Sequence, residues 1–166
     1  MMNFNIQDLY NQSMEALLNA MKQYVNFISV NSSIRSLDIQ VHYLESLPTN
    51  NVMTKYELLD KQSKRQNLMI EKETVTQYII TETYKSIILA LTLVDTTIVN
   101  RNKYGLEMSA TLIQSILKFI LESKQNILIP KEPLIPQMMN TSANLVKSGL
   151  NSNINLAISL NQLMTL

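Results

Sequence analysis

The side chains best suited to acid, base or metal chemistry are scattered along this sequence. The single histidine, His42, precedes Glu45 by three residues, whereas helical metal sites place the glutamate first and add further carboxylates. One imidazole beside one carboxylate lacks the ligand set that a bound metal needs. We therefore expect no metal site, and we interpret His42 as a partly exposed helix residue.

Two carboxylate pairs lie close enough in sequence to consider for general acid–base catalysis, Glu71 with Glu73 and Glu82 with Asp95. Such catalysis needs two carboxylates whose environments push their pKa values apart. Glu71 and Glu73 point to different sides of a helix, so we interpret them as solvated. The two glycines of the chain are 44 positions apart, which excludes the glycine-rich phosphate-binding loops and the nucleophile elbow. The sequence predicts neither an enzyme nor a cofactor.

The composition narrows the class of protein further. Fourteen basic and thirteen acidic residues give a net charge of +1, so the basic excess that nucleic-acid binding requires is missing. Cysteine is absent, which excludes disulfides, thiolate zinc sites and a cysteine nucleophile. Hydrophobic residues make up 46% of the chain, too many for a disordered protein. Charged residues make up 16%, against about 25% in ordinary globular chains.

The sequence contains no clear targeting signal. Residues 1–10 lack a basic segment followed by an apolar one, so we expect no signal peptide. The longest nearly uncharged run, residues 86–99, contains Asp95 and is shorter than the ~20 residues of a membrane-spanning helix. We expect a core helix there, and the cytoplasm, a virion or export by a signal-independent route all remain open.

The scarcity of turn residues is the main indication of the fold. The chain has only two glycines and four prolines, whereas sheets need frequent tight turns built from such residues. Few breaks mean few, long elements. We predict an all-α bundle of about four long amphipathic helices in one domain, with the last helix following a proline-rich linker.

The first helix is expected over residues 5–47, because the residue before Pro48 disfavours the α conformation. Its apolar residues advance in steps of four and three, which places them on one face. The stretch Asn31-Ser32-Ser33 predicts a kink or a drift of this face. The predicted face consists of Ile6, Tyr10, Met14, Leu17, Met21, Tyr24 and Ile28, followed by Ile34, Leu37, Val41 and Leu44.

The second helix is expected to begin at a capping box formed by Thr54 and Glu57. Its first half, residues 55–73, is highly charged and should face solvent. Residues 74–99 are rich in strand-forming side chains, but an unbroken helical spacing and the lack of turn residues favour a core helix. That core face consists of Ile80, Tyr84, Ile87, Leu91, Val94 and Ile98, and a turn should follow at residues 100–105.

The rest of the chain divides at three prolines. A third helix is expected over residues 106–128, with Met108, Leu112, Ile116, Phe119, Ile120 and Ile127 on its core face. Pro130, Pro133 and Pro136 predict a stiff, extended connector, and Pro136 suits the first position of a fourth helix over residues 137–164. The predicted organisation is a three-helix core (residues 1–129), a linker (130–136) and a C-terminal assembly helix (137–166).

The C-terminal segment is unusual in its polar residues. From Pro133 to Leu166 the only charged side chain is Lys147. Uncharged polar groups can be buried when they find hydrogen-bond partners, whereas charges are far costlier. Two interpretations stay open: a helix enclosed by neighbouring copies, or an Asn/Ser-rich tail packed on its own domain. The predicted self-association interface is Met139, Ala143, Val146, Leu150, Ile154, Ala157 and Asn161.

These features favour a structural protein that self-associates through helix–helix packing, such as a component of a virion, a filament or a secretion apparatus. Its expected partners are copies of itself and other assembly proteins, without nucleic acid and without a membrane. One alternative is a small helical chaperone or adaptor that binds a partner helix in an apolar groove. A second alternative is a membrane-active bundle, disfavoured by the low basic excess.

The core face of the second helix gives a first test. Replacing Ile87 or Leu91 by aspartate should abolish folding. Domains are stable by only roughly 5–15 kcal/mol, and the free-energy cost of burying an unpaired charge exceeds this margin. Thermal melts followed by circular dichroism check this. A variant that melts like the parent would place that face in solvent.

Overall fold

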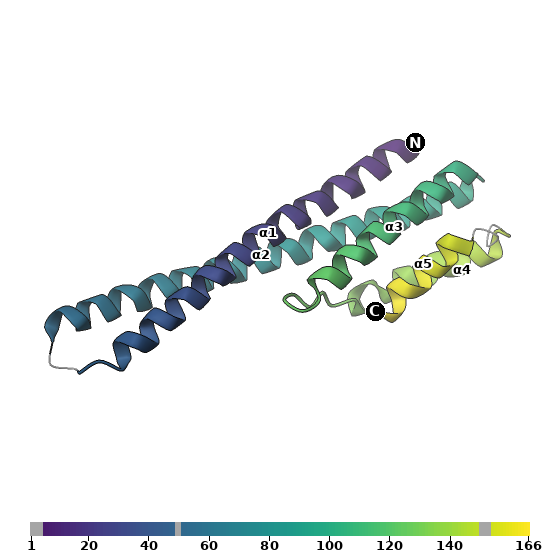
Figure 1. Cartoon of the computed structure of the whole chain (residues 1–166). Helices are drawn as coiled ribbons and strands as arrows, with labels where there is room; N and C mark the ends of the chain where they lie inside the picture. Colours follow the sequence, from purple (N-terminus) through teal and green to yellow (C-terminus); the bar gives the residue numbers. More distant parts are fainter. Residues whose placement is uncertain (1–4, 49–50, 150–153) are drawn as a thin grey trace. The chain divides into compact units, whose positions relative to one another are not determined.

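The computed structural model describes residues 5–48, 51–149 and 154–166, and every regular element in these ranges is helical (Figure 1). The predicted all-α bundle is thereby confirmed, with five α-helices in the described ranges where about four were expected. The elements in chain order are α1 (Ile6–Glu45), α2 (Val52–Val99), α3 (Lys103–Ser123), the 3₁₀ turn η1 (Glu132–Leu134), α4 (Ile135–Lys147) and α5 (Ile154–Thr165).

The chain divides into two compact units, one formed by residues 1–21 and 80–166 and the other by residues 22–79. The helices α1 and α2 are long enough to contribute to both. The smaller unit is a hairpin made from the second part of α1 and the first part of α2. The larger unit contains the remaining helices and the candidate sites described below.

The three long helices each begin directly after an asparagine. The side-chain oxygens of these asparagines accept hydrogen bonds from backbone N–H groups in the first turn, each at 3.0 Å: Asn5 from Gln7, Asn51 from Met53 and Asn102 from Gly105. Because Asn51 already caps α2, that helix begins at Val52. The capping box predicted at Thr54 and Glu57 is therefore wrong, and both residues lie inside the first two turns of α2.

In the smaller unit, α1 buries a single row of apolar side chains. Its members follow the seven-residue spacing of coiled coils, and they are Phe27, Val30, Ile34, Leu37 and Leu44. The predicted row is wrong at Ile28, which is 50% exposed. α1 runs unbroken through residues 31–33, where a kink or a drift of the apolar face was predicted, and the step of four from Val30 to Ile34 carries the row past these polar residues.

The α2 side of this hairpin covers that row partly with basic side chains. The ammonium of Lys72 lies 5.6 Å from the centroid of the Phe27 ring, a cation–π contact. The Arg65 guanidinium forms an ion pair with Asp38 of α1. Long basic side chains can bury their stems on apolar surface and keep the charge in water. Val75 and Ile79 of α2 are buried as well, so basic stems and apolar side chains of α2 together close the hairpin.

In the larger unit, α1 and α2 approach closely at two serines. Ser13 donates its hydroxyl to the Ser86 carbonyl oxygen at 2.7 Å, and Ser86 donates to the Ser13 carbonyl oxygen at 2.9 Å. Both side chains are fully buried, and each hydroxyl has a hydrogen-bond partner in a backbone carbonyl oxygen of the other helix. Ala16 and Ala20 extend this narrow contact along α1. The predicted core position Met21 is wrong, because its side chain is 42% exposed.

The connection between α2 and α3 is shorter than predicted. Arg101 adopts a positive φ of 51° and ends the turn, so that Gly105, expected in the turn, lies in the first turn of α3. A Cβ atom at Gly105 would stand 2.2 Å from Cγ2 of Thr97. Glycine is required there because α2 and α3 almost touch.

The proline connector is less extended than predicted. Pro133 lies within η1, and Pro136 lies at the start of α4 as expected, because the fixed φ of proline suits the first turn of a helix. The Tyr84 hydroxyl of α2 donates a hydrogen bond to the Pro130 carbonyl oxygen. Leu134 is buried. The connector is therefore held against α2 and does not let the C-terminal segment stand away from its unit.

The predicted single helix over residues 137–164 is wrong, because two helices occupy this segment. α4 ends where Gly149 adopts a positive φ of 72°, a backbone conformation that commonly terminates helices. α5 then packs against α3 and α4. Leu156, Leu160 and Leu163 are its buried apolar residues. The C-terminal segment thus belongs to the core of its own unit.

The close approach at Gly105 generates a stability prediction. Gly105→Ala should lower the free energy of unfolding by about 1–2 kcal/mol, because the strain of an extra methyl group exceeds the gain in helix propensity. Thr97→Ser in the same chain should restore part of the loss, since it removes Cγ2 and keeps the hydroxyl that binds the Val94 carbonyl oxygen at 2.8 Å. Denaturant unfolding measures both.

Candidate functional site

The predicted association residues of α4 lie on its outward face. Met139 is 60% exposed and Val146 is 62% exposed, with the exposed Ala143 between them. The opposite face is buried, with Met138 and Leu145 at its two ends. α4 therefore has apolar side chains on both faces, and only one of them is used inside its unit.

On α5 only some of the predicted association residues are exposed. Ile154 is 67% exposed and Asn161 is exposed, whereas Ala157 is half-buried. Leu150 lies outside the described residues. Ile158 is an exposed apolar residue that the sequence reasoning missed, four positions after Ile154. Once a helix is known to begin at Ile154, the i,i+4 spacing identifies it.

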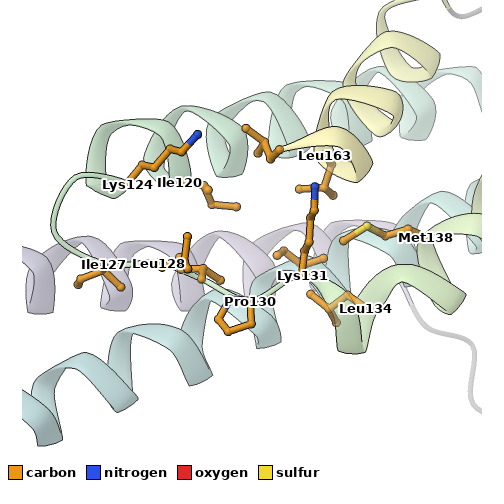
Figure 2. A pocket seen from close by; sticks show the side chains of 12 residues that line it. Ile120, Lys124, Ile127, Leu128, Pro130, Lys131, Leu134, Met138 and Leu163 are labelled. Carbon is orange, nitrogen blue, oxygen red and sulfur yellow. The ribbon is translucent and has the colours of Figure 1, made fainter.

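A pocket of about 240 Å³ opens in the larger unit, between α3, the connector and the two C-terminal helices (Figure 2). Its walls are mostly apolar, with contributions from Ile120, Leu134 and Leu163. Two lysines also line the pocket, Lys124 directly after α3 and Lys131 in the connector. Figure 2 shows Lys131 extending from the connector towards Leu163.

Tyr84 holds the connector that lines this pocket, and the charge of Glu132 acts on its phenol. Burial raises the pKa of Tyr84, and the negative charge of Glu132 raises it further. The phenol therefore stays protonated and can keep donating to the Pro130 carbonyl oxygen. Glu132 acts on Tyr84, while the two lysines are in no ion pair within the described part of the chain. The pocket thus combines apolar walls with unpaired positive charge.

The half-buried carboxylate of Asp95 joins α2 to α4. The Thr141 hydroxyl donates to Oδ2 of Asp95 at 3.2 Å, while Oδ1 is buried without a hydrogen-bond partner. Burial raises the pKa of Asp95, and hydrogen bonds from Thr141 and Asn144 partly oppose this effect. Glu82 stands thirteen residues earlier on the same helix, roughly 20 Å along its axis at 1.5 Å per residue. The two carboxylates cannot act as one catalytic pair.

The remaining candidates for chemistry lie apart from one another. His42 is exposed near the end of α1, and Glu71 and Glu73 are both exposed on α2. Within residues 5–48, 51–149 and 154–166, no three His, Cys, Asp or Glu side chains gather closely enough to hold a metal ion. The same ranges contain no helix long and apolar enough to cross a membrane.

Comparison with known proteins found no matching family model, no similar curated protein and no similar solved structure. The function must therefore be argued from the surfaces and the pocket themselves.

Asp95 generates a pH prediction. When the pKa of an acid is higher in the folded chain than in the unfolded one, the folded state binds more protons between the two values, so stability falls as the pH rises through that interval. Asparagine does not titrate, so the Asp95→Asn variant should not lose stability in this way as the pH rises above ~4, where aspartates usually ionise. At pH 7 the variant should be as stable as the parent or more so.

Denaturant unfolding at a series of pH values measures this effect. Glu15→Gln serves as the control, because Glu15 is exposed on α1 and should leave the pH profile unchanged. A loss of stability in Asp95→Asn at pH 7 would mean that the ionised carboxylate stabilises the fold.

Proposed function

We propose that this chain is a structural protein that self-associates through helix–helix packing, with the outward face of α4 as its principal contact. The observation that supports this most is the second apolar face of α4. Met139, Ala143 and Val146 lie there in steps of four and three, and the only charged side chain of α4 is Lys147 in its last turn. Burying a large apolar side chain fully is worth about 1.5–3 kcal/mol.

The order of residues on this face suits a second copy of the same helix. In an antiparallel pair centred near Ala143, Met139 of one copy meets Val146 of the other. The small alanine side chain lets the two backbones approach at the centre. Such self-complementarity is the requirement of a two-fold interface, in which one patch must fit itself.

The smaller unit supports further contacts of the same kind. It buries apolar residues of both helices between them, yet it also exposes large apolar side chains on both, among them Val25, Ile39, Leu59 and Ile70. A two-helix hairpin leaves more than half of each helix surface uncovered, and helical bundles close by adding helices. We infer that the chain serves as a repeated component of a larger particle, such as a virion, a filament or a secretion apparatus.

Substitutions on α4 test the proposal directly. Met139→Asp and Val146→Asp should each weaken association by about a hundredfold or more, because an unpaired charge left in a buried contact costs on the order of 3 kcal/mol. Light scattering over a range of concentrations gives the particle mass. Circular dichroism on the same samples verifies that the fold is kept.

Asn140→Asp is the matched control. Asn140 is exposed on the same helix, about 100° around the axis from Met139, so the variant adds the same charge at the margin of the apolar face and not within it. It should retain the parent's particle mass. If all three variants keep that mass, or if the control dissociates like the others, the α4 face is not the contact.

A further inference from the structure

We propose that the pocket between α3, the connector and the C-terminal helices binds a small single-chain amphiphile with an anionic head, a medium-chain carboxylate. The inference is independent of self-association. It rests on the size of the pocket, on its apolar walls and on the two lysines beside them.

The size sets the length of the apolar part. A protein cavity of 150 Å³ holds benzene, which has six heavy atoms. In proportion, the volume of about 240 Å³ found here holds roughly ten heavy atoms. An eight-carbon carboxylate has that number, whereas the volume lies below the range of about 300–1,000 Å³ typical of drug-sized ligands.

The walls determine the chemistry of the ligand body. Ile120 of α3, Leu134 before α4 and Leu163 of α5 face the pocket, together with Met138 at the start of α4. These side chains offer no hydrogen bonds that could hold a sugar or a nucleotide. A methionine and branched aliphatic groups instead suit a flexible alkyl chain.

The two lysines determine the charge of the head. Lys124 and Lys131 both line the pocket, from its α3 side and from the connector, and neither is in an ion pair with a described residue. Lys131 is half-buried, whereas Lys124 is exposed. A carboxylate at the mouth of the pocket would accept a charge-assisted hydrogen bond from the Lys131 ammonium, and Lys124 adds a second positive charge to the lining.

Octanoate is the probe for this site, titrated into the full-length chain by calorimetry. We expect saturable binding of one octanoate per chain. Across butyrate, hexanoate and octanoate, affinity should rise roughly fourfold per methylene, the factor that corresponds to burying one such group. The rise should stop at about eight carbons, where the pocket is full, so decanoate should bind no more tightly than octanoate. A series without this dependence on length would overturn the proposal.

Lysine substitutions test the head group. Lys131→Gln should weaken octanoate binding about tenfold or more, the typical worth of a hydrogen bond to a charged group. Lys124→Gln should have a smaller effect, since that side chain is more exposed. Lys118→Gln is the matched control, because Lys118 lies on α3, is 77% exposed and pairs with Glu122 outside the pocket. Octanamide, which keeps the chain and lacks the charge, should bind as weakly as octanoate binds to Lys131→Gln.

Two results would contradict the assignment. Equal binding of octanoate and octanamide would make the lysines irrelevant to the head group. The second result is a fall in particle mass, measured by light scattering on the same samples. If octanoate binds only as the particle mass falls, a neighbouring copy normally occupies the pocket, and the pocket is not a small-ligand site. If Lys131→Gln unfolds, the length series on the parent chain still decides.

Discussion

The packing of α5 against α3 is the contact on which the larger unit depends. α3 is buried along most of its length, with Leu112, Ile113 and Ile116 fully enclosed, so it needs cover on several sides. α5 provides part of that cover through Leu160 and Leu163. α4 packs against α5 in turn, while the Tyr84 hydroxyl holds the connector between α3 and α4 against α2. The pocket lies among these elements, with Ile120 of α3 and Leu163 of α5 both in its lining.

The helical class and most of the core could be predicted from the sequence, because few breakers and a 3–4 spacing leave little choice. Ile87, Leu91 and Val94 of α2 are buried as their spacing predicts. The phase of α1 could not be predicted in the same way. It carries apolar residues on adjacent faces, and only the packing against α2 selects the row that contains Phe27 and Val30 over Met21 and Ile28.

The C-terminal segment marks the other limit of sequence reasoning. Gly149 is one of only two glycines in the chain, and its positive φ follows the end of α4 inside the segment that the spacing predicts as one helix. Treating residues 137–164 as one helix gave the right exposed residues on α4, since phase is kept within one helix. It placed Ala157 on the outward stripe and missed Ile158, because phase is lost across a break. The pocket is lined by residues from α2, α3, the connector, α4 and α5, and no local spacing encodes it.

The asparagine caps of α1, α2 and α3 have a consequence in acid. Aspartate, an equally good capping residue, loses its charge near pH 4 and with it much of its hold on the first turn. The amide oxygens of Asn5, Asn51 and Asn102 have no proton to gain in that range, so these helix starts are indifferent to acidity. Acidification therefore neutralises the exposed carboxylates of this chain without removing the caps at the starts of its three long helices.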